Sequence, residues 1–186
     1  MGDCLDKRIP WMVWEAIAAL DQHLRPGMRV FEWGSGGSTL FWLKHGCTVV
    51  SIDHTPGWPK KVLQRVAEKN LDRIDIRHVQ ASPGTCHDFA SRFAPKLCFR
   101  SYVTAIDNEG TFDVVCVDGR ARVACVRRAI EHVAHGGIMV LDNSDRSFYA
   151  PAVDALASLG WTCQSFSGAG PESKGRQWKT SIFRRP

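Results

Sequence analysis

The sequence of 186 residues has no long hydrophobic run, since nowhere do 18 apolar residues follow one another. Its first residues, MGDCLDKRIPW, also lack the apolar core of a signal peptide. Charges of one sign form no block of five or six residues, and the net charge of +5 is spread along the whole chain. These absences predict a cytoplasmic protein that neither inserts into a membrane nor binds nucleic acid through a basic face.

Cysteines at the spacing of metal or redox motifs are absent as well. The seven cysteines form no C-x-x-C pair, and several lie inside apolar runs such as VVCV. We expect them to be small, buried and reduced side chains. The chain also shows no internal repeat, and its length suffices for one buried core but not for two ordinary domains. The sequence therefore predicts a single domain over residues 1–186.

Apolar runs of strand length alternate along the chain with segments of helical period. This alternation is typical of an α/β fold, a mostly parallel sheet with helices on both faces. Helices are expected at 11–24, within an N-terminal helical segment over 1–27, and at 123–133 and 149–159. Strands are expected at 28–33, 47–53, 74–79, 112–118, 137–142, 161–166 and 178–183. The connection 80–111 is unusually long, which indicates a substrate lid or an additional helix.

A glycine-rich segment, VFEWGSGGST at residues 30–39, follows an apolar strand and leads into a helix-like stretch. Gly34, Gly36 and Gly37 allow a tight turn and a close approach of the backbone to a ligand, because glycine has no Cβ. Open α/β sheets bind ligands at the carboxyl ends of their strands, where this segment is expected to lie. We interpret it as the binding loop of a nucleotide cofactor.

Two residues of this loop favour one cofactor class over another. A dinucleotide loop reads G-x-G-x-x-G, but Thr39 stands where the third glycine belongs. Glu32, two residues before the first glycine, would repel a pyrophosphate but attract the cationic amino acid group of S-adenosyl-L-methionine. The loop therefore favours S-adenosylmethionine over a nicotinamide dinucleotide.

A second carboxylate, Asp53, ends the next strand about 20 residues further on, where such a group accepts hydrogen bonds from ribose hydroxyls. His54 beside it is a candidate for lining the adenine ring. The alternative is that Glu32 and Asp53 only cap helices at the ends of their strands.

Oxygen-bearing side chains follow the two expected strands 112–118 and 137–142. Asp118 ends the first, and Asp142 with Asn143 ends the second. Adjacent parallel strands would place these three residues side by side as hard oxygen ligands for Mg²⁺ or Mn²⁺. The alternative is again that they cap the helices that follow.

Four segments, VFEWGSGGST, SIDHTPGW, FDVVCVDGRAR and GGIMVLDNSDR, together resemble the S-adenosylmethionine-dependent class I methyltransferases over nearly the whole chain. The resemblance implies a Rossmann-like fold whose seven-stranded, mostly parallel sheet has an antiparallel last strand. Asp118, Asp142 and Asn143 are similar to the metal site of the catechol and sugar O-methyltransferases, although Ala121 stands where a lysine or histidine base is often found. The cofactor contacts expected from the loop and from the resemblance are Glu32, Gly34, Ser35, Gly36, Gly37, Ser38, Thr39, Asp53, His54, Ala81 and Ser82.

Methyl transfer mainly requires that an acceptor atom be held in line with the methyl carbon. We expect Asp118 to act through the metal, Arg120 or Arg122 to hold a carboxylate, phosphate or sugar hydroxyl, and Asp145 to be a candidate base. Solvated surface for the arginines and helix capping for Asp145 are the alternatives. Tyr102 and the loop 168–175 are expected to hold the acceptor.

The expected function is thus a metal-assisted O-methyltransferase acting on a sugar or glycan hydroxyl. A catechol or other small phenol is the alternative acceptor. Two other classes stay open, namely a nicotinamide-dependent oxidoreductase and a non-catalytic module that binds S-adenosylmethionine.

Overall fold

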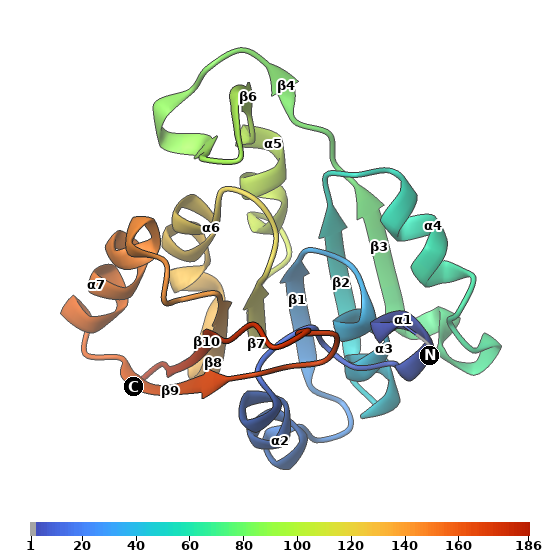
Figure 1. The fold of residues 1–186 in the computed structure, drawn as a ribbon. Coiled ribbons are helices and arrows are strands. Elements are labelled where there is room, and N and C mark those ends of the chain that lie inside the picture. The colour runs from blue at the N-terminus through green and yellow to red at the C-terminus, as the bar shows by residue number, and fades with distance from the viewer. Residues whose placement is uncertain (1–2) are drawn as a thin grey trace.

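A computed structural model describes residues 3–186 as a seven-stranded sheet between two layers of helices (Figure 1). The strand order is β3-β2-β1-β7-β8-β10-β9, and β10 runs antiparallel to both of its neighbours. The strands are β1 (Arg29–Trp33), β2 (Thr48–Asp53), β3 (Ile74–His78), β7 (Phe112–Val117), β8 (Val133–Asp142), β9 (Thr162–Gly168) and β10 (Trp178–Arg184). All seven expected strands are confirmed, and so is the antiparallel last strand.

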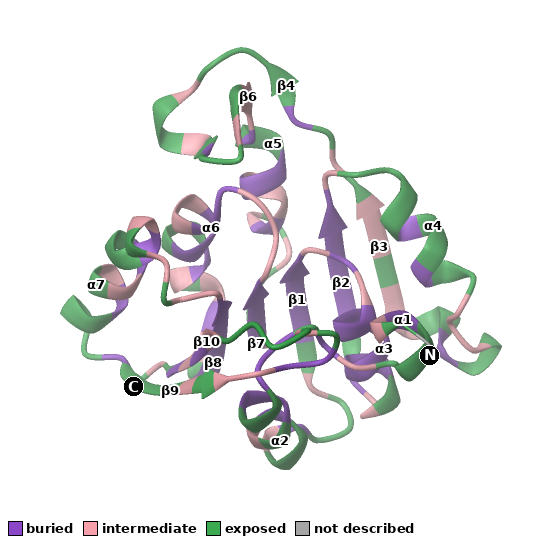
Figure 2. Cartoon of the chain, viewed as in Figure 1, coloured by how far each residue is buried: buried purple, intermediate pink, exposed green. Residues whose placement is uncertain are grey.

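Helices cover both faces of the sheet because its central strands are apolar on both sides, as Figure 2 shows by their burial. Side chains of α2 and α3 share one apolar cluster with Val30, Val49 and Val114. Side chains of α5, α6 and α7 share the other with Phe31 and Val115. The helices are α1 (Cys4–Lys7), α2 (Trp14–His23), α3 (Gly37–Lys44), α4 (Gly57–Leu63), η1 (Glu68–Arg73), α5 (Arg100–Val103), η3 (Thr104–Ile106), α6 (Arg122–Ala129), η4 (Ile130–His132), η5 (Ser147–Tyr149) and α7 (Ala150–Ser158).

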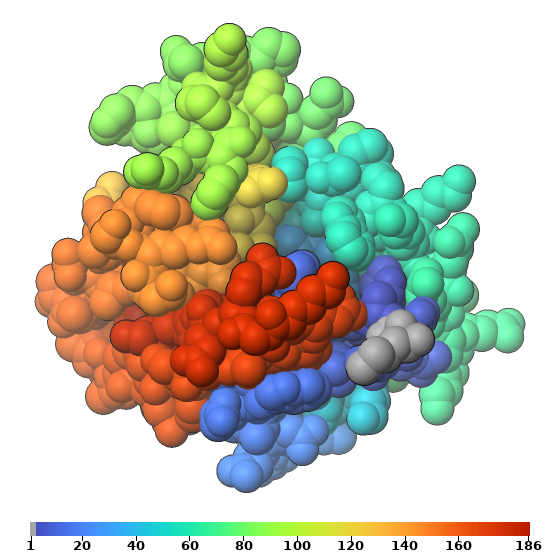
Figure 3. All heavy atoms as spheres, in the orientation of Figure 1, coloured from blue at the N-terminus to red at the C-terminus, as the bar shows by residue number. Residues whose placement is uncertain are grey.

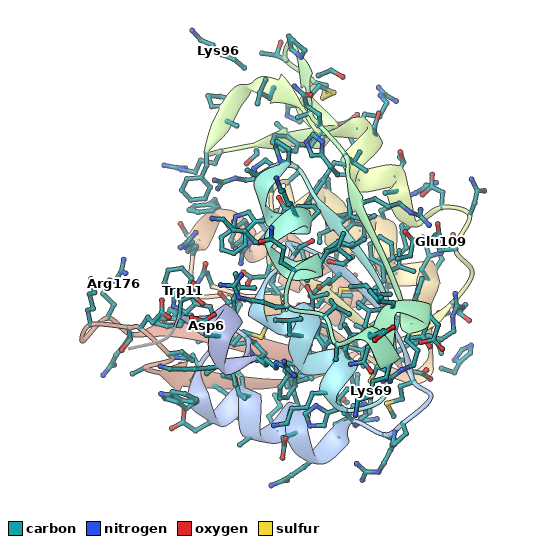
Figure 4. All side chains as sticks on the ribbon, turned by 90° about the vertical axis from the view of Figure 1, so that its right-hand side faces the viewer. Asp6, Trp11, Lys69, Lys96, Glu109 and Arg176 are labelled. Atoms are coloured by element: carbon teal, nitrogen blue, oxygen red, sulfur yellow. A yellow bond between two sulfur atoms is a disulfide. The ribbon has the colours of Figure 1, made fainter. Side chains whose placement is uncertain are left out.

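The first long helix begins at Trp14 rather than at residue 11 as expected. The preceding backbone is held by the far end of the chain, since the Val13 N–H donates to Thr180 Oγ1 at 3.2 Å and the Trp14 N–H donates to the Ala169 carbonyl at 3.1 Å. Figure 4 accordingly shows Trp11 and Arg176 on the same side of the molecule. These partners are more than 150 residues apart in sequence, so local periodicity carries no sign of them.

The long connection folds into a small sheet followed by α5, and we call residues 80–98 the insert. Its strands are β4 (Ser82–Pro83), β5 (Ala90–Ser91) and β6 (Ala94–Cys98), in the order β4-β6-β5, with η2 (His87–Phe89) between the first two. In Figure 1 the insert lies beyond the carboxyl ends of β1, β2 and β7. It therefore occupies the edge of the sheet where a ligand is expected.

A disulfide joins Cys86 to Cys98 within the insert, so the expectation of seven reduced cysteines is wrong for this pair. Cys86 lies before η2 and Cys98 ends β6 of the small sheet, so neither stands in an apolar run of the main sheet, as Cys116 does in VVCV. Cys47, Cys116 and Cys125 are buried and free, as predicted, whereas the free Cys4 is only half-buried and Cys163 is exposed. Within residues 3–186, no helix is long and apolar enough to cross a bilayer.

Candidate functional site

The glycine loop joins β1 to α3 and turns sharply at Gly34, whose φ of +106° lies in the region that favours glycine. A Cβ there would lie 3.0 Å from the Asp118 carbonyl carbon and oxygen, so Gly34 lets the β1 and β7 loops approach one another. A Cβ at Gly37 would lie 2.1 Å from the Ile9 carbonyl oxygen. Gly37 is thus explained by packing of the N-terminal segment rather than by a ligand. Gly36 differs, because a Cβ there would meet no atom within 4 Å.

Glu32 is fully buried below this loop and binds it through its carboxylate. Its oxygens accept hydrogen bonds from the hydroxyls of Ser38 (2.8 Å), Thr39 and Ser51 (2.8 Å) and from the indole N–H of Trp42 (2.9 Å). Burial raises the pKa of Glu32, and these four hydrogen bonds oppose that shift by stabilising the charged form. Glu32 therefore positions the loop and the start of α3, and it presents no surface to a ligand.

Asp53, at the end of β2, holds the other side of the loop. Its Oδ2 accepts the Ser35 backbone N–H at 3.0 Å, and its Oδ1 accepts the Thr55 backbone N–H at 2.7 Å. The Ser35 and Ser51 hydroxyls are 2.7 Å apart, which links Asp53 to the buried network of Glu32. The structure thus brings together the two carboxylates that the sequence singled out.

An aromatic wall lies beside Asp53 at the carboxyl ends of the central strands. The His54 ring centre lies 5.8 Å from that of Phe99 and 6.0 Å from that of Tyr102. Burial lowers the pKa of His54, with Arg120 and His78 adding to the effect and Asp53 opposing it. The ring is therefore neutral near pH 7 and offers a flat, weakly polar surface.

Tyr102, in α5, lies in the core and not on the surface of the connection 80–111, where we expected it to contact an acceptor. A Cβ at Gly119 would lie 1.9 Å from its hydroxyl oxygen, so the loop after β7 encloses that group. Among residues 3–186, the Tyr102 hydroxyl and His54 Nδ1 are the buried side-chain polar atoms without a hydrogen-bond partner. Ala81 is buried in the same apolar cluster, and Ser82 is exposed at the start of the insert.

Asp118 and Asp142 come together at the ends of β7 and β8, but around an arginine. The Arg122 side chain is buried and donates to Asp118 Oδ1 at 2.8 Å, and its Nη1 lies 3.9 Å from Asp142 Oδ2. The Asp142 Oδ1 accepts the Trp178 indole N–H at 3.0 Å and the Thr180 hydroxyl at 2.6 Å. Arg122 also donates to the backbone carbonyls of Asp118, Gly119 and Asp142, so it joins the two strand ends.

These contacts do not fit the expected site for Mg²⁺ or Mn²⁺ at Asp118, Asp142 and Asn143. A guanidinium already supplies the positive charge between the two carboxylates, and the remaining partners of Asp142 are hydrogen-bond donors. Asn143 adopts a left-handed conformation, with φ of 53°, that turns the chain after β8. No group of three or more His, Cys, Asp or Glu side chains in residues 3–186 is placed to hold a metal ion.

The two other candidate catalytic residues, Asp145 and Arg120, have contacts of different kinds. Asp145 accepts the Lys179 backbone N–H at 2.9 Å, so it holds the start of β10. The alternative to a role as base was that Asp145 caps a helix, and its partner is a strand instead. Arg120 is half-buried after β7, with its guanidinium carbon 5.4 Å from the ring centre of Phe93 in the insert. Figure 3 shows the surface hollowed between the insert, α4 and the loop 168–175.

Sequence reasoning missed Ser51, Trp42 and the bridging role of Arg122. Ser51 interrupts the apolar run of β2 and is buried, which is the signal of a polar partner inside the core. Arg122 stands four residues after Asp118, the spacing at which two side chains of one turn meet.

No family model matches the chain, and no curated protein matches it in sequence. Solved structures do match. A precorrin 8W decarboxylase from Methanobacterium thermoautotrophicum is similar with a TM-score of 0.61 at 15% identity, covering 96% of this chain and 93% of its own. A precorrin-6Y C5,15-methyltransferase from Geobacter metallireducens GS-15 is similar with a TM-score of 0.60 at 12% identity, covering 92% and 87%.

The N-methyltransferase NodS from Bradyrhizobium japonicum WM9 matches with a TM-score of 0.61 at 15% identity, covering 92% of this chain and 93% of its own. Its complex with S-adenosyl-L-homocysteine matches with a TM-score of 0.56 at 13% identity, covering 87% and 79%. Similarity at such low identity establishes a fold and not a function. The chain therefore has the Rossmann-like fold of the class I methyltransferases, with a seven-stranded, mostly parallel sheet flanked by helices.

Proposed function

We propose that this chain is an S-adenosylmethionine-dependent methyltransferase. The observation that carries the proposal is the free space at Gly36 beside Asp53, at the carboxyl ends of β1 and β2 in a fold that known methyltransferases share. In that fold this edge of the sheet is where a nucleoside ligand fits. NodS, which matches in fold, has been solved with S-adenosylhomocysteine, the product of the donor.

The cofactor would lie across Gly36, with its ribose at Asp53 and its adenine against His54. Each Asp53 oxygen accepts one backbone N–H and keeps a lone pair for a ribose hydroxyl. His54, neutral and packed against Phe99, offers a face for stacking. Glu32 contributes by shaping the loop and by its negative charge below it.

Thermal unfolding with S-adenosylmethionine, S-adenosylhomocysteine and NAD⁺ tests this assignment. We expect the first two to raise the unfolding temperature, since a ligand that binds only the folded state stabilises it, and NAD⁺ to leave it unchanged. Stabilisation by NAD⁺ alone would instead favour a nicotinamide-dependent oxidoreductase. Binding without transfer to any acceptor of a broad panel would favour the non-catalytic module.

Asp118 is the residue that we propose as proton acceptor in the transfer. When bound, S-adenosylmethionine supplies a methyl group on a sulfonium, which leaves as the neutral thioether S-adenosylhomocysteine. Asp118 takes the proton of the acceptor hydroxyl while the oxygen of that hydroxyl bonds to the methyl carbon. Its side chain is 23% exposed at the end of β7, and Arg122 fixes its orientation.

The acceptor atom proposed here is a hydroxyl oxygen of a small molecule. The preference for a glycan depended on the resemblance to metal-dependent sugar O-methyltransferases, whose metal site the structure does not support, and the matching structures include a C5,15-methyltransferase and an N-methyltransferase. Sugars, phenols, amines and carbon acids therefore belong in one panel, assayed with methyl-labelled donor. Transfer to an amine or carbon alone would overturn the oxygen assignment and leave the methyltransferase assignment standing.

Gly36→Ala is expected to weaken binding of S-adenosylhomocysteine by about tenfold or more and to leave the unfolding temperature unchanged. The new Cβ meets nothing within the chain, and the φ of 174° at Gly36 is extended backbone that alanine adopts easily. The methyl group would instead occupy the space of the cofactor. Calorimetric titration measures the affinity.

The matched control for Gly36→Ala is Gly168→Ala, on the edge strand β9. Its Cβ would make ordinary contacts with Glu15 and Val13 at 3.4 and 3.5 Å, so we expect wild-type affinity and stability. Wild-type affinity in Gly36→Ala would contradict the cofactor placement.

Methyl transfer is expected to increase as pH increases through about 7, the pKa to which burial raises Asp118. Asp142 and Glu32 raise this pKa further, and Arg122 opposes them. Asp118 is protonated below that pKa and cannot take a proton, so kcat/KM should fall about tenfold per pH unit on the acid side. A pH profile of kcat/KM measures this limb.

Two variants separate the candidate bases. Asp118→Asn is expected to lose the acid limb together with most of the activity. Asp145→Asn keeps an oxygen to accept the Lys179 N–H, so it should retain both. The same acid limb in Asp118→Asn would show that another group titrates.

A further inference from the structure

Three arginines gather around two phenylalanine rings at the rim beside Asp118. The guanidinium carbons of Arg120 and Arg146 each lie 5.4 Å from the ring centre of Phe93, and that of Arg92 lies 5.0 Å from the ring centre of Phe148. The two ring centres are 5.8 Å apart. We call these five residues the arginine–phenylalanine cluster.

The cluster is assembled from three separate parts of the chain. Arg92 and Phe93 come from the insert, Arg120 follows β7, and Arg146 and Phe148 follow β8. The disulfide Cys86–Cys98 closes the segment that carries the first two. The cluster thus joins the insert to the strand ends that hold Asp118 and Asp142.

The positive charge of the cluster is not neutralised within the chain. Of the residues that the structure describes, no carboxylate lies within 4.0 Å of Arg92, Arg120 or Arg146, and their side chains donate no hydrogen bond. By contrast, Arg122 a few residues away has two carboxylate neighbours. An aromatic ring orients a guanidinium but accepts none of its in-plane N–H groups. Three like charges at one place, each with free donors, favour an anion.

A small cavity borders the cluster between the insert, the start of α6 and η5. Its volume is about 110 Å³, and its lining includes Arg92, Phe148, Ser91 and the buried side chain of Arg122. Such a volume holds about three or four water-sized groups, which matches a carboxylate, sulfate or phosphate. Phe93 is 51% exposed beside it, which leaves an apolar surface for the rest of a ligand.

We propose that the methyl acceptor carries an anionic group, a carboxylate, phosphate or sulfate, which Arg92, Arg120 and Arg146 bind. That the anion belongs to a methyl acceptor rests on the proposed function. The anion site itself rests only on the contacts and charges of the cluster. Arg120 thus binds an anionic group of the acceptor, one of the roles expected for it from the sequence. Arg122 does not share it, because its donors are already used by backbone carbonyls and by Asp118.

The experiment compares three proteins: wild type, a cluster variant and a charge-matched control. The cluster variant is Arg92→Gln, Arg120→Gln and Arg146→Gln. The control is Lys96→Gln, Arg127→Gln and Arg176→Gln, which removes the same charge from exposed positions elsewhere. Figure 4 shows Lys96 projecting from the tip of the insert and Arg176 on another side.

Calorimetric titration with inorganic phosphate, in the presence of S-adenosylhomocysteine, is the first readout. We expect the cluster variant to bind phosphate at least about tenfold more weakly than wild type and the control to stay within about twofold. Equal phosphate affinity in the cluster variant and in wild type would overturn the proposal. So would an equal loss in the control, because then only net charge would matter.

Methyl transfer to matched acceptors is the second readout. The two members of each pair share at least one acceptor hydroxyl and differ by an anionic group, as in glucose against glucose 6-phosphate and phenol against hydroxybenzoate. The anionic member should have the higher kcat/KM in wild type, and the cluster variant should lose this preference through KM. No preference in wild type, or a single-stranded oligonucleotide that competes better than any small anion, would overturn the small anionic acceptor.

The titration of S-adenosylhomocysteine itself keeps the two proposals apart. Its affinity should stay within about twofold in all three proteins, because Arg120 acts on His54 only through its charge and, within residues 3–186, no hydrogen bond joins the cluster to Gly36 or Asp53. Failure of this binding in wild type contradicts the methyltransferase assignment, whatever phosphate does. Intact cofactor binding with phosphate affinity unaffected by the cluster variant contradicts the anion site alone.

Discussion

Glu32→Ala is expected to abolish measurable binding of S-adenosylmethionine and to lower the free energy of unfolding by about 3 kcal/mol or more. The substitution removes the acceptor of four buried hydrogen bonds, which come from Ser38, Thr39, Trp42 and Ser51. Hydrogen bonds to a charged group contribute about 1.5–3 kcal/mol each, although they are not additive. Without them the start of α3 and the glycine loop lose their common support. Urea unfolding and calorimetric titration measure the two effects.

Two further variants show whether the loss comes from the buried network. Glu68→Ala removes an exposed carboxylate of η1 that makes no ion pair or hydrogen bond in the described residues, and we expect wild-type stability and affinity. Glu32→Gln keeps the size of the side chain but sets an amide N–H₂ against donors, so it should lie between wild type and Glu32→Ala. Full cofactor affinity in a folded Glu32→Ala protein would refute the positioning role of this carboxylate.

The fold was predictable because its main signal is local. The runs that form β1, β2 and β7 are apolar on both faces, and segments of helical period separate the strands. The position of Asp53 at a strand end, next to the glycine loop, follows from the same pattern. The insert was visible only as a long connection, because two-residue strands such as β4 and β5 leave no periodicity to detect.

The site was harder to predict because its polar contacts come from distant residues. Asp118 and Asp142 do lie together, as adjacent strands require, but the partners of Asp142 at Trp178 and Thr180 are 36 and 38 residues away. Oxygen ligands at two strand ends are compatible with a metal ion or with a guanidinium, and residue type alone does not distinguish the two. Gly37 shows the same limit, since its close neighbour is the backbone of Ile9.

Arg122→Met is expected to lower the free energy of unfolding by about 3–5 kcal/mol near pH 8, the cost of leaving buried charges without their partner. Methionine keeps most of the side-chain volume but removes the cation beside Asp118 and Asp142. It also leaves the backbone carbonyls of Asp118, Gly119 and Asp142 without their donor. Urea unfolding measures this loss.

The destabilisation in Arg122→Met should shrink as pH falls. Burial raises the pKa of both Asp118 and Asp142, and Arg122 opposes that shift, so its loss raises both pKa values further. A raised pKa means that the folded state binds more protons than the unfolded state over the pH range between the two pKa values. Stability then falls as pH rises through that range and is regained as pH falls toward the unfolded value near 4.

Arg127→Met, on the same helix α6, is the matched control for Arg122→Met. Arg127 is exposed and has no carboxylate within 4.0 Å among the residues that the structure describes, so we expect a change within about 0.5 kcal/mol at every pH. The decisive comparison is the difference between the two variants at pH 8 and at pH 5. A difference that does not depend on pH would mean that Arg122 stabilises the strand ends through their carbonyls alone and leaves the charge of the two carboxylates to another group.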